Sequence, residues 1–146
     1  MTPSRLHLLL IIAGCMAVMP AAVAECGNEY QVRGVVRDGG GRPVSDARVW
    51  VLLDKISEKK TIAQGIRARQ ARTDRSGIFS AHVVCGGENG GSNPCAKKAR
   101  HLTIAAGGDG YGLKLRAFKL KDLEVVERGG VCLVDVPPFS LGTTIR

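Results

Sequence analysis

Aromatic residues are scarce in this sequence of 146 residues, which has one tryptophan, two tyrosines and three phenylalanines. Proteins that hold single-stranded nucleic acid stack its bases on aromatic rings, so this scarcity argues against a nucleic-acid partner. After residue 24 the sequence also lacks an apolar run that approaches the length of a membrane-spanning helix. We therefore expect neither a nucleic-acid partner nor a transmembrane segment.

The motifs of common catalytic and metal sites are missing as well. There is no Cys-x-x-Cys pair, and His82 and His101 stand alone without the spacing of metal ligands. Ser80, His82 and Asp74 can be written as a triad, but no nucleophile elbow surrounds any serine. The glycine runs lack the Lys-Ser or Lys-Thr of a phosphate loop. We therefore expect no catalytic residue, no metal, no cofactor and no enzymatic activity.

The first 24 residues have the organisation of a secretory signal. A start with one positive charge, residues 1–5, is followed by an apolar run to residue 19 and by Ala22-Val23-Ala24, which matches a cleavage site. Cleavage after Ala24 would leave Glu25 as the first mature residue. We therefore expect residues 1–24 to be a signal peptide and the protein to be periplasmic or secreted.

An alternative maturation involves Cys15. The segment Ile12-Ala13-Gly14-Cys15 resembles a bacterial lipoprotein box, which would leave a lipidated Cys15 at the new N-terminus. The residues that follow Cys15 are apolar, whereas lipoproteins usually have a polar tether there. We therefore favour ordinary cleavage, and mass spectrometry of the mature N-terminus distinguishes the two.

Four cysteines remain after cleavage: Cys26, Cys85, Cys95 and Cys132. An even number in an oxidising compartment favours disulfides over a metal site, although four cysteines allow three pairings. The nine residues between Cys85 and Cys95 are rich in glycine, and a bridge there would contribute about 3 kcal/mol by restraining the unfolded chain. This spacing favours Cys85–Cys95, with Cys26–Cys132 as the second disulfide.

Short alternating segments separated by glycine-rich turns follow the signal. Residues 34–49 give the clearest pattern, because apolar alternation flanks a turn from Asp38 to Pro43, which predicts a half-buried hairpin. Further strands are expected at 30–37, 47–53, 78–85, 101–106, 113–120 and 131–136, with a charged edge strand in 65–73. In 113–120 we expect Leu113, Leu115 and Ala117 to share one face, opposite Lys114, Arg116 and Phe118. About seven short strands without helical periodicity predict a single all-β sandwich in residues 25–146.

Two motifs resemble those of a known family. Gly34-x-Val36-x-Asp38, with Gly41-x-Pro43-Val44 and Ala47-x-Val49, is similar to the opening of carboxypeptidase regulatory-like domains, and Thr73-Asp74-x-x-Gly77-x-Phe79 is similar to their second marker. The resemblance implies a transthyretin-like Greek-key β-sandwich in residues 25–146, used as an accessory or recognition module. It implies no peptidase activity, because that activity belongs to a separate zinc domain.

Intradiol dioxygenases share a related sandwich topology and hold iron with two tyrosines and two histidines. Tyr30, Tyr111, His82 and His101 match that count. The closely spaced histidine pair of that family is missing, so we expect no iron site.

Basic side chains are the remaining candidates for a site, since the chain has a formal net charge of +8. We expect Arg33, Arg37, Arg48 and Trp50 to face outward on adjacent strands, where an indole can stack on a sugar or a side chain. A second basic face would combine Arg67, Arg69, Arg72, Lys114, Arg116, Lys119 and Lys121. The alternative is structural: the arginines protect an edge strand from pairing, and Trp50 fills a gap.

These observations favour a non-enzymatic exported module that binds a protein or an anionic glycan of the bacterial cell envelope. The alternative is a structural or assembly subunit whose edge strand pairs with another envelope protein. A binder would be monomeric and would lose its ligand on replacement of Trp50 or the arginines, whereas an assembly subunit would be oligomeric.

Overall fold

The protein is all-β, as predicted. The computed structural model describes residues 29–54, 68–84 and 99–144. These ranges contain nine strands and one turn of 3-10 helix: β1 (Glu29–Asp38), β2 (Arg48–Asp54), β3 (Arg69–Arg72), β4 (Ile78–Val84), β5 (His101–Gly108), β6 (Tyr111–Lys119), η1 (Leu120–Asp122), β7 (Glu124–Arg128), β8 (Val131–Asp135) and β9 (Phe139–Leu141). No helix in the described ranges has the length and hydrophobicity that a bilayer crossing requires.

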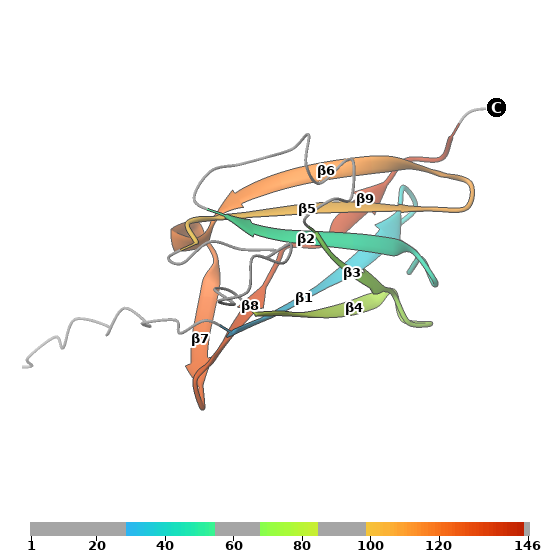
Figure 1. Cartoon of the computed structure of the whole chain (residues 1–146). Coiled ribbons are helices and arrows are strands. Elements are labelled where there is room, and N and C mark those ends of the chain that lie inside the picture. Colours follow the sequence, from blue (N-terminus) through green and yellow to red (C-terminus); the bar gives the residue numbers. More distant parts are fainter. Residues whose placement is uncertain (1–28, 55–67, 85–98, 145–146) are drawn as a thin grey trace, which may run out of the picture.

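The strands form two sheets (Figure 1). The first has the order β4-β1-β8-β7, with β9 paired to β1, and the second has the order β3-β2-β5-β6. Most pairs are antiparallel, but β1 runs parallel to both β8 and β9. The described strands exceed the seven or so expected because β7 is a strand of its own and β9 follows the Pro137-Pro138 pair, beyond the last expected strand at 131–136.

One hydrophobic core receives side chains from both sheets. In β4, Phe79, Ala81 and Val83 are buried, whereas the residues between them are exposed, which is the alternation of a strand with one face on the core. The buried cluster joins them to residues of β1, β2 and β5, among them Val32, Val49 and Ile104. Each fully buried aliphatic or phenyl side chain contributes about 1.5–3 kcal/mol relative to exposure. These strands therefore each place one apolar face on the core.

The hairpin expected in residues 34–49 is wrong, because β1 and β2 lie in different sheets. The turn itself is present: the Asp38 N–H donates to the Arg42 carbonyl at 2.8 Å, and the Val44 N–H donates to the Val36 carbonyl at 3.0 Å. After this short return the chain crosses to the second sheet. The local turn chemistry was therefore visible in the sequence, but it does not determine where the following strand pairs.

The expected alternation in residues 113–120 is confirmed, and the face that meets the core is the one with Arg116 and Phe118. Phe118 packs against the core cluster, and Arg116 lies opposite Ile104 of β5 on the same face, whereas Leu115 belongs to a small cluster on the other face. Arg116 is accommodated on the core side because its guanidinium lies over the Phe118 and Phe139 rings, 5.1 and 5.7 Å from their centroids.

The cysteine predictions lie largely outside the described ranges, which include Cys132 but not the other three. Cys132, in β8, is fully buried and disulfide-bonded. The pairings Cys26–Cys132 and Cys85–Cys95 stay predictions.

Candidate functional site

Four side chains gather on the outward face of β2 and β3. The register pairs Arg48 with Arg72 and Trp50 with Gln70 across the two antiparallel strands. Val49 and Val51, the residues between them in β2, are fully buried in the core. Because side chains alternate between the faces of a strand, Arg48, Trp50, Gln70 and Arg72 lie together on the side away from the core.

These side chains line a hollow, which we call the β2–β3 hollow. Its volume is about 450 Å³, and its described walls are Arg48, Trp50, Gln70, Ala71 and Arg72. Trp50 is half-buried and packs against a small apolar cluster on the same face, in which Leu52 and Ala105 are buried. The indole is therefore held by its neighbours, whereas the two guanidinium groups are exposed.

The two arginines of the hollow differ in whether a carboxylate pairs with them. Arg72 donates from Nη1 to Asp46 Oδ1 at 2.7 Å. Within the described part of the chain, no carboxylate pairs with Arg48. Like charges directly opposite each other on neighbouring strands are unfavourable, so an anion between the two arginines would relieve their repulsion.

The position of Asp46 is fixed by the chain that crosses between the sheets. Asp46 has a left-handed backbone, with φ of 57°, a conformation that Asp and Asn tolerate better than most residues. Its N–H donates to the Thr73 carbonyl at 3.0 Å. The buried Thr73 hydroxyl donates to the Val44 carbonyl at 2.6 Å and accepts from the Ala47 N–H at 2.8 Å. These hydrogen bonds therefore hold the backbone of Asp46 beside the C-terminal end of β3.

The other arginines expected with Arg48 and Trp50 are elsewhere. Arg33 and Arg37 belong to β1, which is in the other sheet and not adjacent to β2. Arg33 makes a two-pronged ion pair with Asp135, with both N–O distances 3.1 Å, and Arg37 donates to the Gly41 carbonyl at 2.9 Å. These two arginines are already engaged, so the expected four-residue surface reduces to Arg48 and Trp50.

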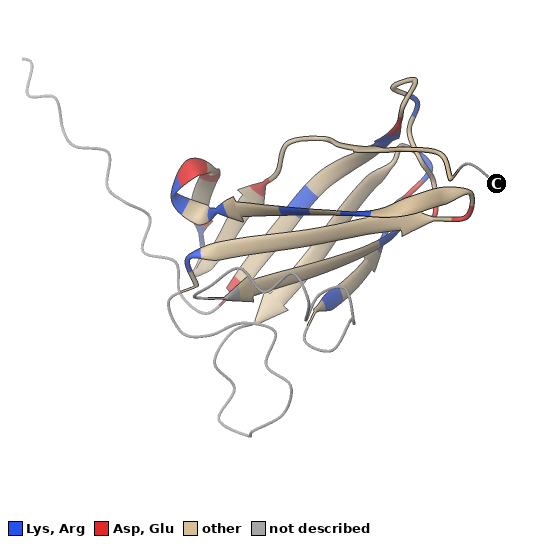
Figure 2. Ribbon diagram, turned by 90° about the horizontal axis from the view of Figure 1, so that it is seen from above, with Lys and Arg blue, Asp and Glu red and all other residues tan. Residues whose placement is uncertain are grey.

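The second expected basic face is also divided. Arg67 lies outside the described residues, and Arg69 lies on the face of β3 opposite that of Gln70 and Arg72. Lys114 donates to the Ser140 carbonyl at 2.7 Å, and Arg116 donates to the Pro138 carbonyl at 3.3 Å. Figure 2 accordingly shows Lys and Arg distributed over several strands. Lys119 ends β6 and Lys121 lies in η1, so neither is on β2 or β3.

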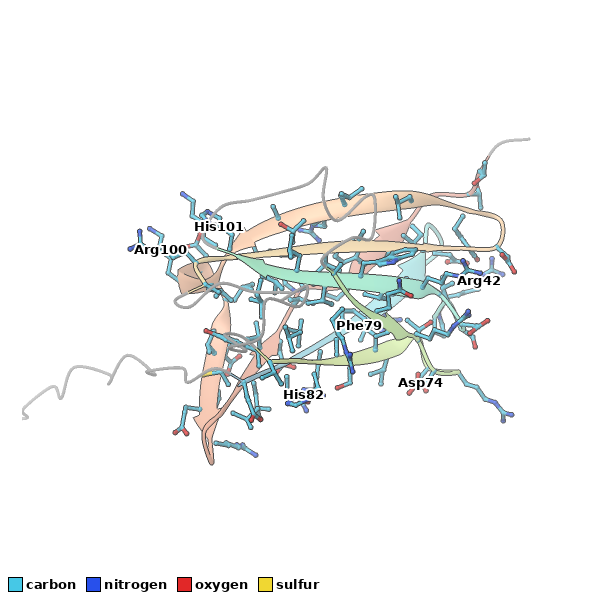
Figure 3. The ribbon with its side chains drawn as sticks, in the orientation of Figure 1. Arg42, Asp74, Phe79, His82, Arg100 and His101 are labelled. Atoms are coloured by element: carbon cyan, nitrogen blue, oxygen red, sulfur yellow. The ribbon has the colours of Figure 1, made fainter. Side chains whose placement is uncertain are left out.

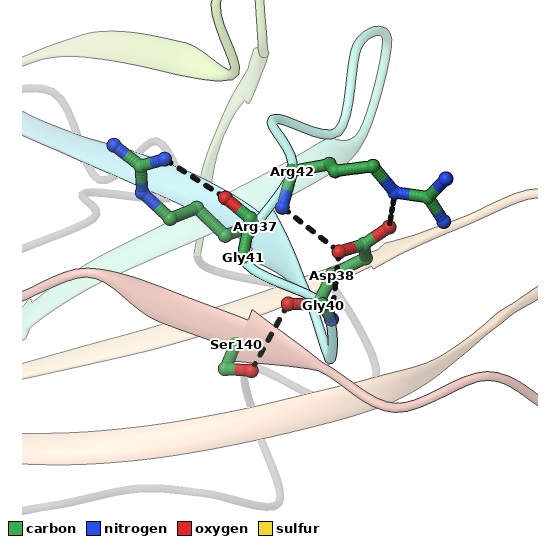
Figure 4. A network of polar contacts seen from close by, with 6 residues as sticks. All are labelled: Arg37, Asp38, Gly40, Gly41, Arg42 and Ser140. Atoms are coloured by element: carbon green, nitrogen blue, oxygen red, sulfur yellow. Dashed lines mark hydrogen bonds and ion pairs between the residues drawn. The ribbon is translucent and has the colours of Figure 1, made fainter.

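Arg42 is engaged within the turn after β1, which Figure 4 shows with its neighbours. Its backbone N–H donates to Asp38 Oδ1 and its Nε to Asp38 Oδ2, both at 2.9 Å, while the Gly40 N–H donates to Oδ1 at 2.9 Å. The hydrogen bond from the Arg42 backbone is the main reason that the pKa of Asp38 is lowered; bonds from the Arg42 side chain and Gly40 add to it. Asp38 is a structural cap of this turn.

The sequence did not reveal Gln70, which lines the hollow, or Asp46, which pairs with Arg72 at its edge. Gln70 has the same parity as Arg72 in β3, and that spacing was the one available signal. Asp46 could not be found in this way, because its approach to Arg72 depends on hydrogen bonds to Thr73, 27 residues later in the sequence.

Comparisons with known proteins identify the fold. No protein-family model and no curated protein matches the chain. Among solved structures, the chain is similar to 3-chlorocatechol 1,2-dioxygenase from Rhodococcus opacus 1CP, with a TM-score of 0.53, 19% identity and coverage of 86% of this chain and 64% of that one. It is similar to the dioxygenase domain of a dioxygenase–carbohydrate-binding protein fusion from Streptomyces sp. SirexAA-E, with a TM-score of 0.53, 14% identity and coverage of 84% of each chain.

A third similar structure is hydroxyquinol 1,2-dioxygenase from Pseudomonas putida DLL-E4, with a TM-score of 0.52, 15% identity and coverage of 81% of this chain. The chain spans 57% of that enzyme and 64% of the Rhodococcus enzyme. At such identities the similarity shows a common fold and leaves the activity to be established.

These neighbours overturn the function expected from the sequence. The non-enzymatic envelope-binding module and its alternative, the strand-pairing assembly subunit, are corrected because the solved structures that share the fold are enzymes. The expectation that the chain is not an enzyme is corrected by the same finding. It rested on missing catalytic motifs, whereas a fold is determined by apolar patterning and turns, which many enzymes share with binding modules.

The residues of this chain do not fit an iron site of two tyrosines and two histidines. Tyr30 is 5% exposed on the core face of β1, and burial raises the pKa of its phenol, which opposes a phenolate ligand. His82 lies on the outward face of β4, with Nε2 3.3 Å from Glu29 Oε2. His101 begins β5 in the other sheet (Figure 3). Tyr111 follows the far end of β5, roughly 20 Å or more from His101 at the usual rise of a strand.

The sequence offers few other residues for such a set. It has two tyrosines and three histidines, and the third histidine, His7, lies outside the described residues. Among the described residues, no group of three or more His, Cys, Asp or Glu side chains is placed to hold a metal. The fold is thus similar to that of catechol dioxygenases, but its tyrosines and histidines are not brought together.

Proposed function

We propose that the chain is a dioxygenase-fold protein that binds a small carboxylate with a planar ring, and that the β2–β3 hollow is its ligand site. The observation that carries this proposal is the position of Arg48, which is exposed, lacks a carboxylate partner among the described residues and lies beside the indole of Trp50. The proposal concerns binding at this site and applies whether or not the bound carboxylate is then chemically converted.

The chemistry of the walls supports this ligand class. A guanidinium group has a planar set of donors that matches the two oxygens of a carboxylate. The half-buried indole offers an apolar surface next to it, and Gln70 adds an amide that can donate and accept hydrogen bonds. A volume of about 450 Å³ is within the usual range of small-molecule pockets.

Tryptophan fluorescence tests the proposal directly, because Trp50 is the one tryptophan of the sequence. Benzoate should change its emission saturably, whereas benzamide, which has the same shape without the charge, should bind at least about tenfold more weakly, as expected for loss of a charged hydrogen bond. Equal responses to benzoate and benzamide would reject the carboxylate assignment.

Matched variants locate the binding site. Arg48→Gln should weaken benzoate binding, whereas Arg75→Gln, in the exposed turn between β3 and β4, should leave it unchanged. The two variants remove the same charge from exposed positions. An equal loss in both would show that net charge, and not the hollow, attracts the ligand.

The activity of the structural neighbours is a second candidate, favoured by the fold alone. It is the 1,2-dioxygenase reaction named for the catechol and hydroxyquinol enzymes. The positions of Tyr30, Tyr111, His82 and His101 do not support the iron centre of two tyrosines and two histidines. Purified protein incubated with ferric iron and then with catechol tests this candidate. Stoichiometric bound iron and catechol-dependent oxygen uptake would support it, and the absence of both would reject it.

We also propose that residues 1–24 are a signal peptide and that residues 25–146 form an exported single domain, with the Greek-key, transthyretin-like topology of carboxypeptidase regulatory-like domains. The contribution of both sheets to one core supports a single sandwich. The two predicted disulfides belong to this proposal. Mass spectrometry of the mature protein tests the N-terminus, and peptide mapping without reduction tests the pairing: a Cys26–Cys85 bridge would refute it.

A further inference from the structure

We propose that Asp46 determines the specificity of the β2–β3 hollow, because its carboxylate occupies Arg72 in place of a ligand and restricts the free site to the guanidinium of Arg48. This inference rests on the proposed function. It assigns to Asp46 the role of a positioning residue that acts on the ligand through Arg72.

The ion pair is short but open to exchange. Arg72 Nη1 lies 2.7 Å from Asp46 Oδ1, while the side chains of Arg72 and Asp46 are 55% and 75% exposed. Ion pairs with this exposure are weak, because water and salt screen them. A ligand carboxylate can therefore compete with Asp46 for Arg72, and the competition reduces the affinity of the ligand.

The backbone keeps Asp46 in the competing position. Its left-handed conformation and the hydrogen bond from its N–H to the Thr73 carbonyl place it next to the end of β3. Arg72 directly precedes Thr73 in the chain, so the same contact holds both partners of the ion pair close together. The competing carboxylate is thus part of the crossover from β1 to β2.

Release of Arg72 would create a site with two arginines. Arg48 and Arg72 are directly opposite on neighbouring strands, where Cβ atoms are about 4.5–5.5 Å apart. Two guanidinium groups at this spacing suit a ligand with two adjacent carboxylates. The inference therefore predicts that Asp46 selects against dicarboxylates and leaves monocarboxylates as the preferred ligands.

The test compares benzoate with phthalate, its 1,2-dicarboxylate analogue, by Trp50 fluorescence. Asp46→Asn removes the charge and keeps a residue that tolerates the left-handed backbone. We expect this variant to bind phthalate about two- to fivefold more tightly than the unmodified protein does, as expected for loss of one exposed competing ion pair. Benzoate affinity should rise less. Asp109→Asn, at the exposed tip of the β5–β6 hairpin, is the control for net charge.

The Arg72→Gln background shows whether Asp46 acts through Arg72. A gain on Asp46→Asn that disappears in Arg72→Gln supports the inference. If the unmodified protein binds benzoate but Asp46→Asn does not improve phthalate binding, or if the gain persists without Arg72, the inference is overturned and the proposed function stands. If neither protein gives a saturable response to either carboxylate, the proposed function fails, and the inference fails with it.

Discussion

The two edges of the β3-β2-β5-β6 sheet carry arginines in opposite situations. At the β6 edge, Arg116 is half-buried over the Phe118 and Phe139 rings and donates to the Pro138 carbonyl, and the neighbouring Lys114 donates to the Ser140 carbonyl. At the β3 edge, Arg72 has one exposed carboxylate partner and Arg48 has none among the described residues. The comparison shows that a basic residue suggests a ligand only when the fold leaves its donors available.

The largest expected effect is on stability at the β6 edge. Arg116→Ala removes the ring contacts and the hydrogen bond to Pro138, so we expect the free energy of unfolding to fall by about 1–3 kcal/mol. Arg48→Ala should change it by no more than about 0.5 kcal/mol, as is usual for exposed positions. Urea unfolding at pH 7 measures both. Equal losses in the two variants would remove the distinction between the edges.

The second prediction concerns binding at the β3 edge. Arg48→Gln should weaken benzoate binding about tenfold, because one charged hydrogen bond contributes about 1.5–3 kcal/mol and part of it is replaced by the glutamine amide. Lys114→Gln should leave binding unchanged, since Lys114 donates its hydrogen bond to the Ser140 carbonyl of β9. Isothermal titration calorimetry gives both affinities. A larger loss of affinity in Lys114→Gln than in Arg48→Gln would place the ligand at the β6 edge and contradict the proposed site.

The sequence predicted the strands better than their partners. The strands at 30–37 and 78–85 were predicted from their alternation, which is visible in a single segment, and Val32 and Phe79 of these strands lie in the core. The sequence showed the alternation of β6 but not which of its faces meets the core, because Lys114 and Arg116 resemble solvent-facing residues. Their acceptors, the carbonyls of Ser140 and Pro138, lie 26 and 22 residues away, and only the tertiary fold brings them near.

Only part of the site was predicted, because the rest of it depends on contacts between segments that are distant in the sequence. Arg48 and Trp50 were expected to face outward, and the buried Val49 and Val51 between them agree with that position. Their supposed companions Arg33 and Arg37 were grouped with them because residues 34–49 were interpreted as a hairpin. Once the chain crosses to the other sheet, the neighbours of Arg48 come from β3, and these depend on register, which a single sequence does not determine.

Salt gives a smaller effect that sharpens the comparison. Raising the salt concentration from about 0.05 to 0.5 M should weaken benzoate binding several-fold, because exposed charges are screened over a Debye length that falls below about 10 Å. The stability difference between the unmodified protein and Arg116→Ala should change little, because Arg116 is half-buried against rings. Fluorescence titration and urea unfolding at both concentrations test this. Salt-independent benzoate binding would contradict an exposed arginine site.

The smallest expected effect is the pH dependence of the turn after β1, where Arg42 is engaged by Asp38. Folding lowers the pKa of Asp38 from 3.8, so its carboxylate favours the folded state above that value. The contribution is lost as the pH falls through the lower pKa of the folded protein. Asp38→Asn should therefore remove part of the loss of stability below about pH 4. Thermal unfolding between pH 2 and 7 measures it, and identical acid profiles would contradict the assigned role.

The most direct measurement is a ¹H–¹⁵N NMR titration of the protein with benzoate. We expect the single indole N–H signal of Trp50 and the backbone amides of β2 and β3 to shift saturably, with little change in β6 and β9. Saturable shifts confined to the β6 edge, or no saturable shift at Trp50, would contradict the claim that the fold leaves its ligand-binding arginine at the β3 edge.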